Sequence, residues 1–155
     1  MNRRVNGQDD TFVNTQAIRL IKKFEGKSLV PYACPGGYKT IGWGHRVLPY
    51  ESFVSLTLRE AEVLLVHDLQ RCGRTLTQLV TVPLERHQEA ALLSFLFNVG
   101  GGAFQRSTLR MKVNRQEHLD VPYEFHRWVW AKGRKLPGLI ARRAVEAACY
   151  EGVLF

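Results

Sequence analysis

The chain has 155 residues, of which 45% are hydrophobic, and it carries a formal net charge of +8 at pH 7. This length is typical of one domain with a buried core, and this hydrophobic content excludes a disordered chain. The basic excess favours an anionic partner, but the basic residues are scattered and lack the stripe or motif of a nucleic-acid-binding domain.

Neither a signal peptide nor a transmembrane segment is evident in the sequence. Residues 1–14 form a polar N-terminal segment, and no apolar run is long enough to cross a bilayer. Three cysteines, Cys34, Cys72 and Cys149, are too few and too far apart for a disulfide scaffold or a zinc site. Cys72 and Cys149 occupy apolar positions of helical stretches, where small buried residues are expected.

The first predicted elements are a helix and a small antiparallel sheet. Thr15 can cap a helix that ends at Glu25 and Gly26, because its apolar residues recur on one side. Between residues 32 and 43 aromatic and β-branched residues flank a Pro-Gly-Gly turn at 35–37. This pattern predicts a hairpin.

The rest of the chain is predicted to be helical. Thr57 and Glu60 form a capping box for a long amphipathic helix that reaches Leu79, and Gly73 can interrupt it. Further helices are predicted from Pro83 to Phe97, from Ser107 to Val113, from Asp120 to Trp130 and from Gly138 to Tyr150. We therefore expect one α+β domain over residues 15–155, predominantly α-helical, with its sheet near the N-terminus.

Glu25, Cys34 and Thr40 are candidate catalytic residues. Eight residues separate Glu25 from Cys34, and five separate Cys34 from Thr40. A chain that leaves the helix at Glu25 and returns through a hairpin brings the thiol and the hydroxyl back toward the carboxyl group. Apolar neighbours penalise the charged form of a carboxyl group, which suits a general acid. Each residue alone would be ordinary, so the prediction depends on their common spacing.

The ordered motifs resemble those of the phage-type lysozyme (endolysin, muramidase) family. The spacing Glu-x8-Cys-x5-Thr is similar to the catalytic signature of that family, in which the middle residue is Asp or, in one branch, Cys. The resemblance covers roughly residues 15–152, and its blocks include 24–26, 40–45, 94–100, 136–139 and 142–146.

The resemblance implies a two-lobed, lysozyme-like fold with a saccharide cleft between sheet and helices. It also implies hydrolysis of the β-1,4 bond between N-acetylmuramic acid and N-acetylglucosamine in peptidoglycan. Glu25 would be the general acid, Thr40 would hold the attacking water, and Cys34 would replace the second catalytic side chain. The thiol could be the base for the water, a covalent nucleophile or only a hydrogen-bonding partner, and the family favours water activation with inversion. The matched cleft residues are Tyr32, Gly44, Arg46, Phe97, Asn98, Ser107 and Arg127.

Other residues that match the family are expected to be structural. His45 resembles a buried histidine that pairs with an aspartate at the position of Asp68. Phe97 fits a core position as well as a cleft position. The helical spacing of Arg142, Arg143 and Glu146 predicts ion pairs on the surface or between the lobes.

The main alternative is a noncatalytic protein that binds the cell wall or another anionic polymer. Such a protein would not need an acid, a thiol and a hydroxyl group at this spacing, so catalysis is favoured. We expect a monomer that needs neither a metal nor another cofactor and that binds the glycan strands of peptidoglycan rather than nucleic acid. The resemblance also implies that a separate holin releases it from the host cytoplasm to the periplasm and cell wall.

Overall fold

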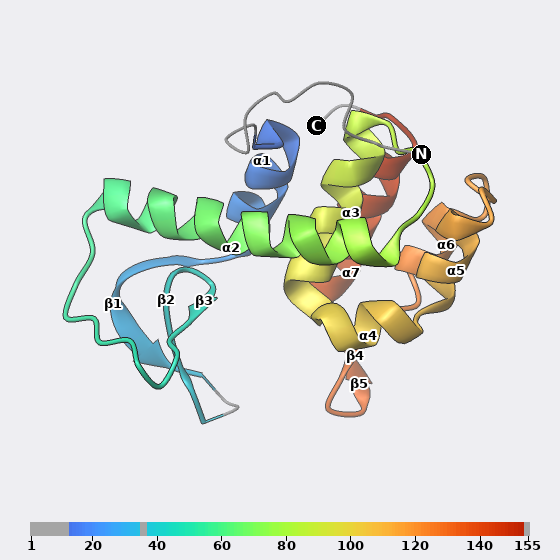
Figure 1. Cartoon of the computed structure of the whole chain (residues 1–155). Coiled ribbons are helices and arrows are strands. Elements are labelled where there is room, and N and C mark those ends of the chain that lie inside the picture. The colour runs from blue at the N-terminus through green and yellow to red at the C-terminus, as the bar shows by residue number, and fades with distance from the viewer. Residues whose placement is uncertain (1–12, 35–36, 154–155) are drawn as a thin grey trace, which may run out of the picture.

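The computed structural model describes residues 13–34 and 37–153 of the chain, which form a small sheet and a larger group of helices (Figure 1). The helices are α1 (Thr15–Phe24), α2 (Leu58–Leu79), α3 (Arg86–Val99), α4 (Gly101–Arg106), α5 (Thr108–Asn114), α6 (Val121–Phe125) and α7 (Pro137–Tyr150). The strands are β1 (Lys27–Ala33), β2 (Lys39–Trp43), β3 (His45–Arg46), β4 (Trp130–Ala131) and β5 (Arg134–Lys135). The predicted α+β, mostly helical fold class is confirmed.

The cap of α1 is Asn14, one residue before the predicted Thr15. The Asn14 side-chain oxygen accepts hydrogen bonds from the backbone N–H groups of Gln16 and Ala17, at 3.1 and 3.2 Å. Its amide nitrogen donates to the carbonyl of Arg86 at 3.0 Å. Asn14 therefore satisfies the open helix end and also attaches α1 to the start of α3.

The predicted hairpin is part of an antiparallel sheet with the strand order β1-β2-β3. Tyr32 pairs with Thr40, and Thr40 pairs with Arg46 on the next strand. Directly paired residues project from the same side of a sheet, so these three side chains form one row across it. Two residues of the predicted turn, 35 and 36, lie outside the described residues.

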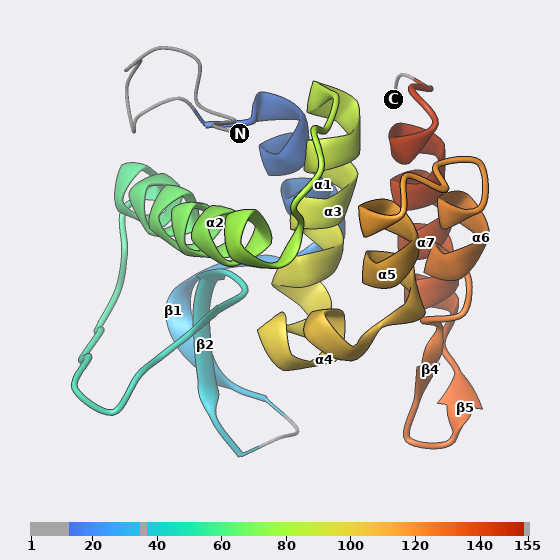
Figure 2. The ribbon, with the colours of Figure 1, turned by 45° about the vertical axis from the view of Figure 1, so that its right-hand side comes forward.

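Helix α2 joins the sheet to the other helices. It contacts β2 and β3 along one part and α3 and α4 along another, and Figures 1 and 2 show it running between the two groups. The capping box of Thr57 and Glu60 is present as predicted. The expected interruption at Gly73 is absent, because the buried Leu69 and Leu76 on either side hold the helix against the core.

The C-terminal half differs from the predictions at several boundaries. α3 begins at Arg86 after a capping box at Glu85, and α4, which was not predicted, follows directly behind Gly100. The cap of α5 by Ser107 is confirmed. The helix predicted over residues 120–130 ends at Phe125, and the chain then forms the β4–β5 hairpin.

The core lies mainly among α1, α2, α3, α6 and α7. Phe95 of α3 is fully buried and makes edge-on contacts with Phe104, Phe125 and Trp128. All three cysteines are free thiols, and burial raises the pKa of both Cys72 and Cys149 to about 11. Within the described ranges, no helix has the length and apolar character needed to cross a bilayer.

Candidate active site

Glu25 ends α1 and lies against α7. Its backbone N–H donates to the carbonyl of Ile21 at 2.8 Å, and its side chain is 23% exposed. Nη1 of Arg142 donates to Oε1 of Glu25 at 2.7 Å. The carboxyl group is therefore fixed by a charge from a residue 117 positions away, which the sequence analysis did not connect with Glu25.

The predicted ion pairs of Arg142, Arg143 and Glu146 form in the interior, so the first of the two predicted locations, the surface, was wrong. Their exposed fractions are 3%, 1% and 0%. Glu146 contacts both guanidinium groups and accepts a hydrogen bond of 2.6 Å from Ser94. Burial lowers the pKa of Arg143, and the Glu146 carboxylate opposes that shift. Opposite charges that leave water together require such close pairing.

Gly44 connects the sheet to the Glu25 carboxyl group. Its φ is +74°, and a Cβ atom at this position would lie 3.0 Å from Oε2 of Glu25 and 3.5 Å from the ring of Phe97. Only glycine allows both the backbone conformation and this close approach. The structure therefore brings two of the predicted cleft residues, Gly44 and Phe97, to Glu25. Phe97 also packs against the core, which is one of its two expected environments.

Cys34 and Thr40 meet on the sheet. The Cys34 sulfur lies 2.7 Å from the Thr40 hydroxyl oxygen, and either atom can be the donor. Thr40 is 4% exposed, whereas Cys34, next to the turn, is partly exposed. The hairpin register produces this contact, because the backbone N–H of Cys34 donates to the carbonyl of Tyr38 at 2.8 Å.

Tyr32, Tyr38 and Arg46 surround this pair on the sheet. The Arg46 guanidinium lies 4.3 Å from the centroid of the Tyr38 ring, and all three side chains are exposed. Burial raises the pKa of Tyr32, and the negative charges of Cys34 and Glu25 raise it further. Tyr32 is therefore within electrostatic reach of both candidate catalytic groups. Tyr38 was not predicted, although its position two residues before Thr40 places it on the same face.

The remaining candidates lie on the helices. Asn98 is exposed at the end of α3, and its side-chain oxygen accepts a hydrogen bond from Arg143. The Ser107 hydroxyl donates to the carbonyl of Phe104 at 2.7 Å and accepts from the N–H of Arg110 at 3.1 Å. Both of these hydrogen bonds are with backbone groups. Ser107 also lines a hollow whose other lining residues are Arg106, Thr108, Glu124, Arg127 and Trp128.

His45 connects β3 to α2, and its predicted pairing with Asp68 is confirmed. Nδ1 lies 2.8 Å from an Asp68 carboxylate oxygen, and Nε2 lies 2.9 Å from Glu51. The hydrogen bond with Asp68 raises the pKa of His45; burial opposes the shift, and Glu51 adds to it. The His45 side chain is 5% exposed, and its contact with Asp68 attaches β3 to α2. In the described part of the chain, no three His, Cys, Asp or Glu side chains form a group that could hold a metal ion.

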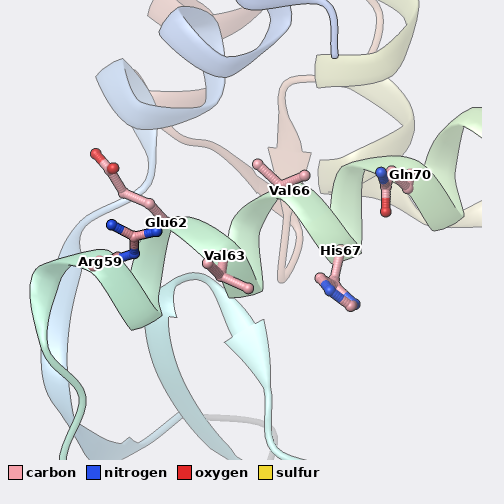
Figure 3. Close-up of a pocket in the computed structure, with 6 residues that line it drawn as sticks. All are labelled: Arg59, Glu62, Val63, Val66, His67 and Gln70. Atoms are coloured by element: carbon pink, nitrogen blue, oxygen red, sulfur yellow. The ribbon is translucent and has the colours of Figure 1, made fainter. Parts of the chain in front are cut away.

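A separate pocket lies on the outer face of α2, and none of the predicted site residues lines it. Figure 3 shows side chains from successive turns of that helix around it. The lining residues are Arg59, Glu62, Val63, Val66, His67 and Gln70. Their spacing of three and four residues is that of one helix face.

Comparisons with known proteins agree with this architecture. A model of the family "Phage lysozyme" matches residues 22–146. An endolysin of Acyrthosiphon pisum secondary endosymbiont phage 1 is 36% identical over 143 residues, which are 90% of this chain and 97% of the endolysin.

Two solved structures are similar over most of the chain. The muramidase domain of SpmX from Asticaccaulis excentricus superposes with a TM-score of 0.78 at 32% identity, covering 86% of this chain and 93% of that domain. A mutant of P22 lysozyme superposes with a TM-score of 0.77 at 31% identity, covering 88% of this chain and 96% of that protein. Together with the family match over residues 22–146, these similarities show that the chain belongs to the phage lysozyme family.

Proposed function

We propose that the protein is a muramidase that hydrolyses the β-1,4 bond between N-acetylmuramic acid and N-acetylglucosamine in peptidoglycan. One observation carries the proposal: a carboxyl group fixed by Arg142 lies beside Gly44, which directly follows the strand of Thr40, and the Thr40 hydroxyl contacts the Cys34 thiol. Membership of the phage lysozyme family and similarity to a muramidase domain support the same reaction.

Glu25 is the proposed general acid. Its Oε1 is held by Arg142, whereas Oε2 faces Gly44 at the junction of sheet and helices. In the reaction the proton of the Glu25 carboxyl group moves to the glycosidic oxygen as the bond from that oxygen to the anomeric carbon breaks. The leaving sugar then departs as a neutral alcohol, and Glu25 remains as a carboxylate.

Cys34 and Thr40 are proposed to act on the water molecule. A water beside this pair would be oriented by the Thr40 hydroxyl and would give a proton to the Cys34 thiolate while its oxygen bonds to the anomeric carbon. Attack from the side opposite the leaving oxygen inverts the configuration at that carbon. The contact of 2.7 Å between sulfur and hydroxyl oxygen supports a joint action of the two groups.

The glycan strand is proposed to bind along the sheet and across Gly44. Tyr32 and Arg46 lie in the row of Thr40, and Phe97 and Asn98 approach from α3. Ser107 and Arg127 line a hollow on the helical side, where they are proposed to contact the glycan as well. The charge of +8 attracts the protein to anionic wall polymers. We further propose that a monomer acts at the wall after a holin releases it from the cytoplasm.

The test compares the wild type with Glu25→Gln, which keeps the shape of the side chain but cannot supply the proton. Glu62→Gln is the matched control, because it makes the same change in an exposed carboxylate of α2 that pairs with Lys22. We expect Glu25→Gln to release reducing ends from peptidoglycan about a thousandfold more slowly. Full activity of this variant would refute the acid assignment. A wild type that binds the wall without releasing reducing ends would instead be a noncatalytic wall-binding protein.

A further inference from the structure

Glu146 is a fully buried carboxylate in α7, behind the proposed active site. Ser94 donates to its Oε2 at 2.6 Å, and Nε of Arg142 lies 3.4 Å from the same oxygen. Arg143 donates to its other oxygen. A buried carboxylate is strongly unfavourable unless it is paired, so its charge and these partners depend on one another.

The guanidinium group of Arg142 links Glu146 to Glu25. Nε of its guanidinium faces Glu146, Nη2 donates to the carbonyl oxygen of Ser94 at 3.1 Å, and Nη1 donates to Glu25 at 2.7 Å. All three nitrogens of a planar, rigid group are therefore engaged. Removal of the partner on Nε would leave the group held only through Nη1 and Nη2 and would loosen its orientation toward Glu25.

The charges of this cluster balance. Two residues of α7 face Glu25: Arg142 contacts it directly, and Arg143 acts on it at longer range. Tyr32 of β1 also faces it. The α3 groups that contact the two arginines, Ser94 and Asn98, are uncharged.

Glu146 faces the same two arginines, and its other titratable neighbour is Cys149, which burial and the Glu146 charge keep as a neutral thiol. Two cations thus stand against two carboxylates. If Glu146 were neutral, the second cation would be unbalanced, and it would favour loss of the proton from Glu25.

We propose that Glu146 is a positioning residue that acts on Glu25 through Arg142. It fixes the guanidinium that orients the Glu25 carboxyl group, and its negative charge balances the positive charge of Arg143. This inference rests on the proposed function, in which Glu25 is the general acid.

The test measures kcat and KM on soluble peptidoglycan fragments as a function of pH, for the wild type, Glu146→Gln and Glu146→Asp. We expect Glu146→Gln to move the alkaline limb of the profile to lower pH by about one unit, because one negative charge near Glu25 is lost. We also expect kcat to fall more than about tenfold with little change in KM, since orientation is lost but saccharide contacts remain. Glu146→Asp keeps the charge and should restore the alkaline limb. Glu62→Gln should leave the profile unchanged.

Ser94→Ala keeps the inference testable if Glu146→Gln does not fold. It removes the hydroxyl that holds Glu146 but keeps every charge, so kcat should fall several-fold without a change in KM. A purely structural role predicts a lower melting temperature with an unshifted pH profile and an unchanged kcat, and that result would overturn the inference.

The same assay on Glu25→Gln distinguishes a failure of the proposed function from a failure of the role proposed for Glu146. An active Glu25→Gln variant refutes the proposed function. An inactive Glu25→Gln variant together with Glu146 and Ser94 variants that behave like the wild type refutes only the role of Glu146.

Discussion

The helical side and the sheet side of the proposed cleft are built in different ways. On the helical side, Glu25 is held by Arg142, which is held by Glu146, and the residues come from opposite ends of the chain. On the sheet side, Cys34 and Thr40 are six positions apart in one hairpin and meet through strand register. A change on the helical side should therefore alter stability and pH dependence together with activity. A change on the sheet side should alter mainly activity.

After Glu25→Gln, the largest effect is expected from Thr40→Val on the sheet side. The substitution keeps the shape of the side chain and removes the hydroxyl that contacts the Cys34 sulfur. We expect the rate of peptidoglycan hydrolysis to fall about a hundredfold, because the attacking water loses its orientation. The free energy of unfolding should change by less than about 1 kcal/mol, since one contact with the Cys34 sulfur is lost and the core is retained.

Thr77→Val is the matched control for this variant. The Thr77 hydroxyl donates to the carbonyl of Gly73 on the exposed side of α2, at 2.9 Å and away from the proposed site. Rates and chemical denaturation are measured for both variants. Equal activity in Thr40→Val and the wild type would remove Thr40 from the mechanism.

A smaller effect is expected from Gly44→Ala, where the two sides meet. The new Cβ would lie 3.0 Å from Oε2 of Glu25, and a φ of +74° is unfavourable for alanine. We expect a loss of about 1–2 kcal/mol in the free energy of unfolding from the backbone alone. Displacement of the Glu25 carboxyl group should also reduce the rate about tenfold.

Gly133→Ala separates strain from displacement. Gly133 in the β4–β5 hairpin has a φ of +78°, and an added Cβ would meet no atom within 4 Å. This control should lose similar stability and retain full activity. A Gly44→Ala variant as active as Gly133→Ala would show that the close approach to Glu25 has no catalytic consequence.

The smallest effect concerns His45 of β3, which attaches the sheet to Asp68 of α2. Its folded-state pKa is raised above the ordinary value of 6.5 by the hydrogen bond with Asp68, against burial, with a further contribution from Glu51. A raised pKa contributes stability that is fully present below the unfolded value and is lost as the pH rises through the folded value.

We therefore expect the stability difference between the wild type and His45→Asn to be about 1 kcal/mol larger near pH 6 than near pH 9. Chemical denaturation at the two pH values measures it. A difference that is independent of pH, or larger at high pH, would contradict the assignment of a protonated His45 between two carboxylates.

The sequence predicted the sheet side better than the helical side, and the reason is physical. Strand alternation and a turn place Tyr32, Cys34 and Thr40 together within one short segment, so local patterns are sufficient. The partner of Glu25 lies 117 positions away, and helical spacing predicted ion pairs around Arg142 without indicating that they are buried. Only the packing of α7 against α1 and α3 brings them together.

The wrong boundaries have local causes as well. Thr15 and Asn14 are both good caps, and the contact of Asn14 with Arg86 makes the difference. The β4–β5 turn contains Lys132 at a φ of +52°, a conformation that a lysine does not signal in the sequence. Tyr38 shares the face of Thr40 by simple alternation, so this part of the site could have been predicted.

The central claim is that Glu25 protonates the leaving oxygen while water, activated at Cys34 and Thr40, attacks from the opposite side. The anomeric configuration of the first product, followed by proton NMR as the wild type cleaves soluble peptidoglycan fragments, tests this claim most directly. The account predicts that the new reducing end appears first as the α-anomer, inverted from the β-linked substrate. A β-anomer as the first product would contradict it and would indicate a covalent intermediate.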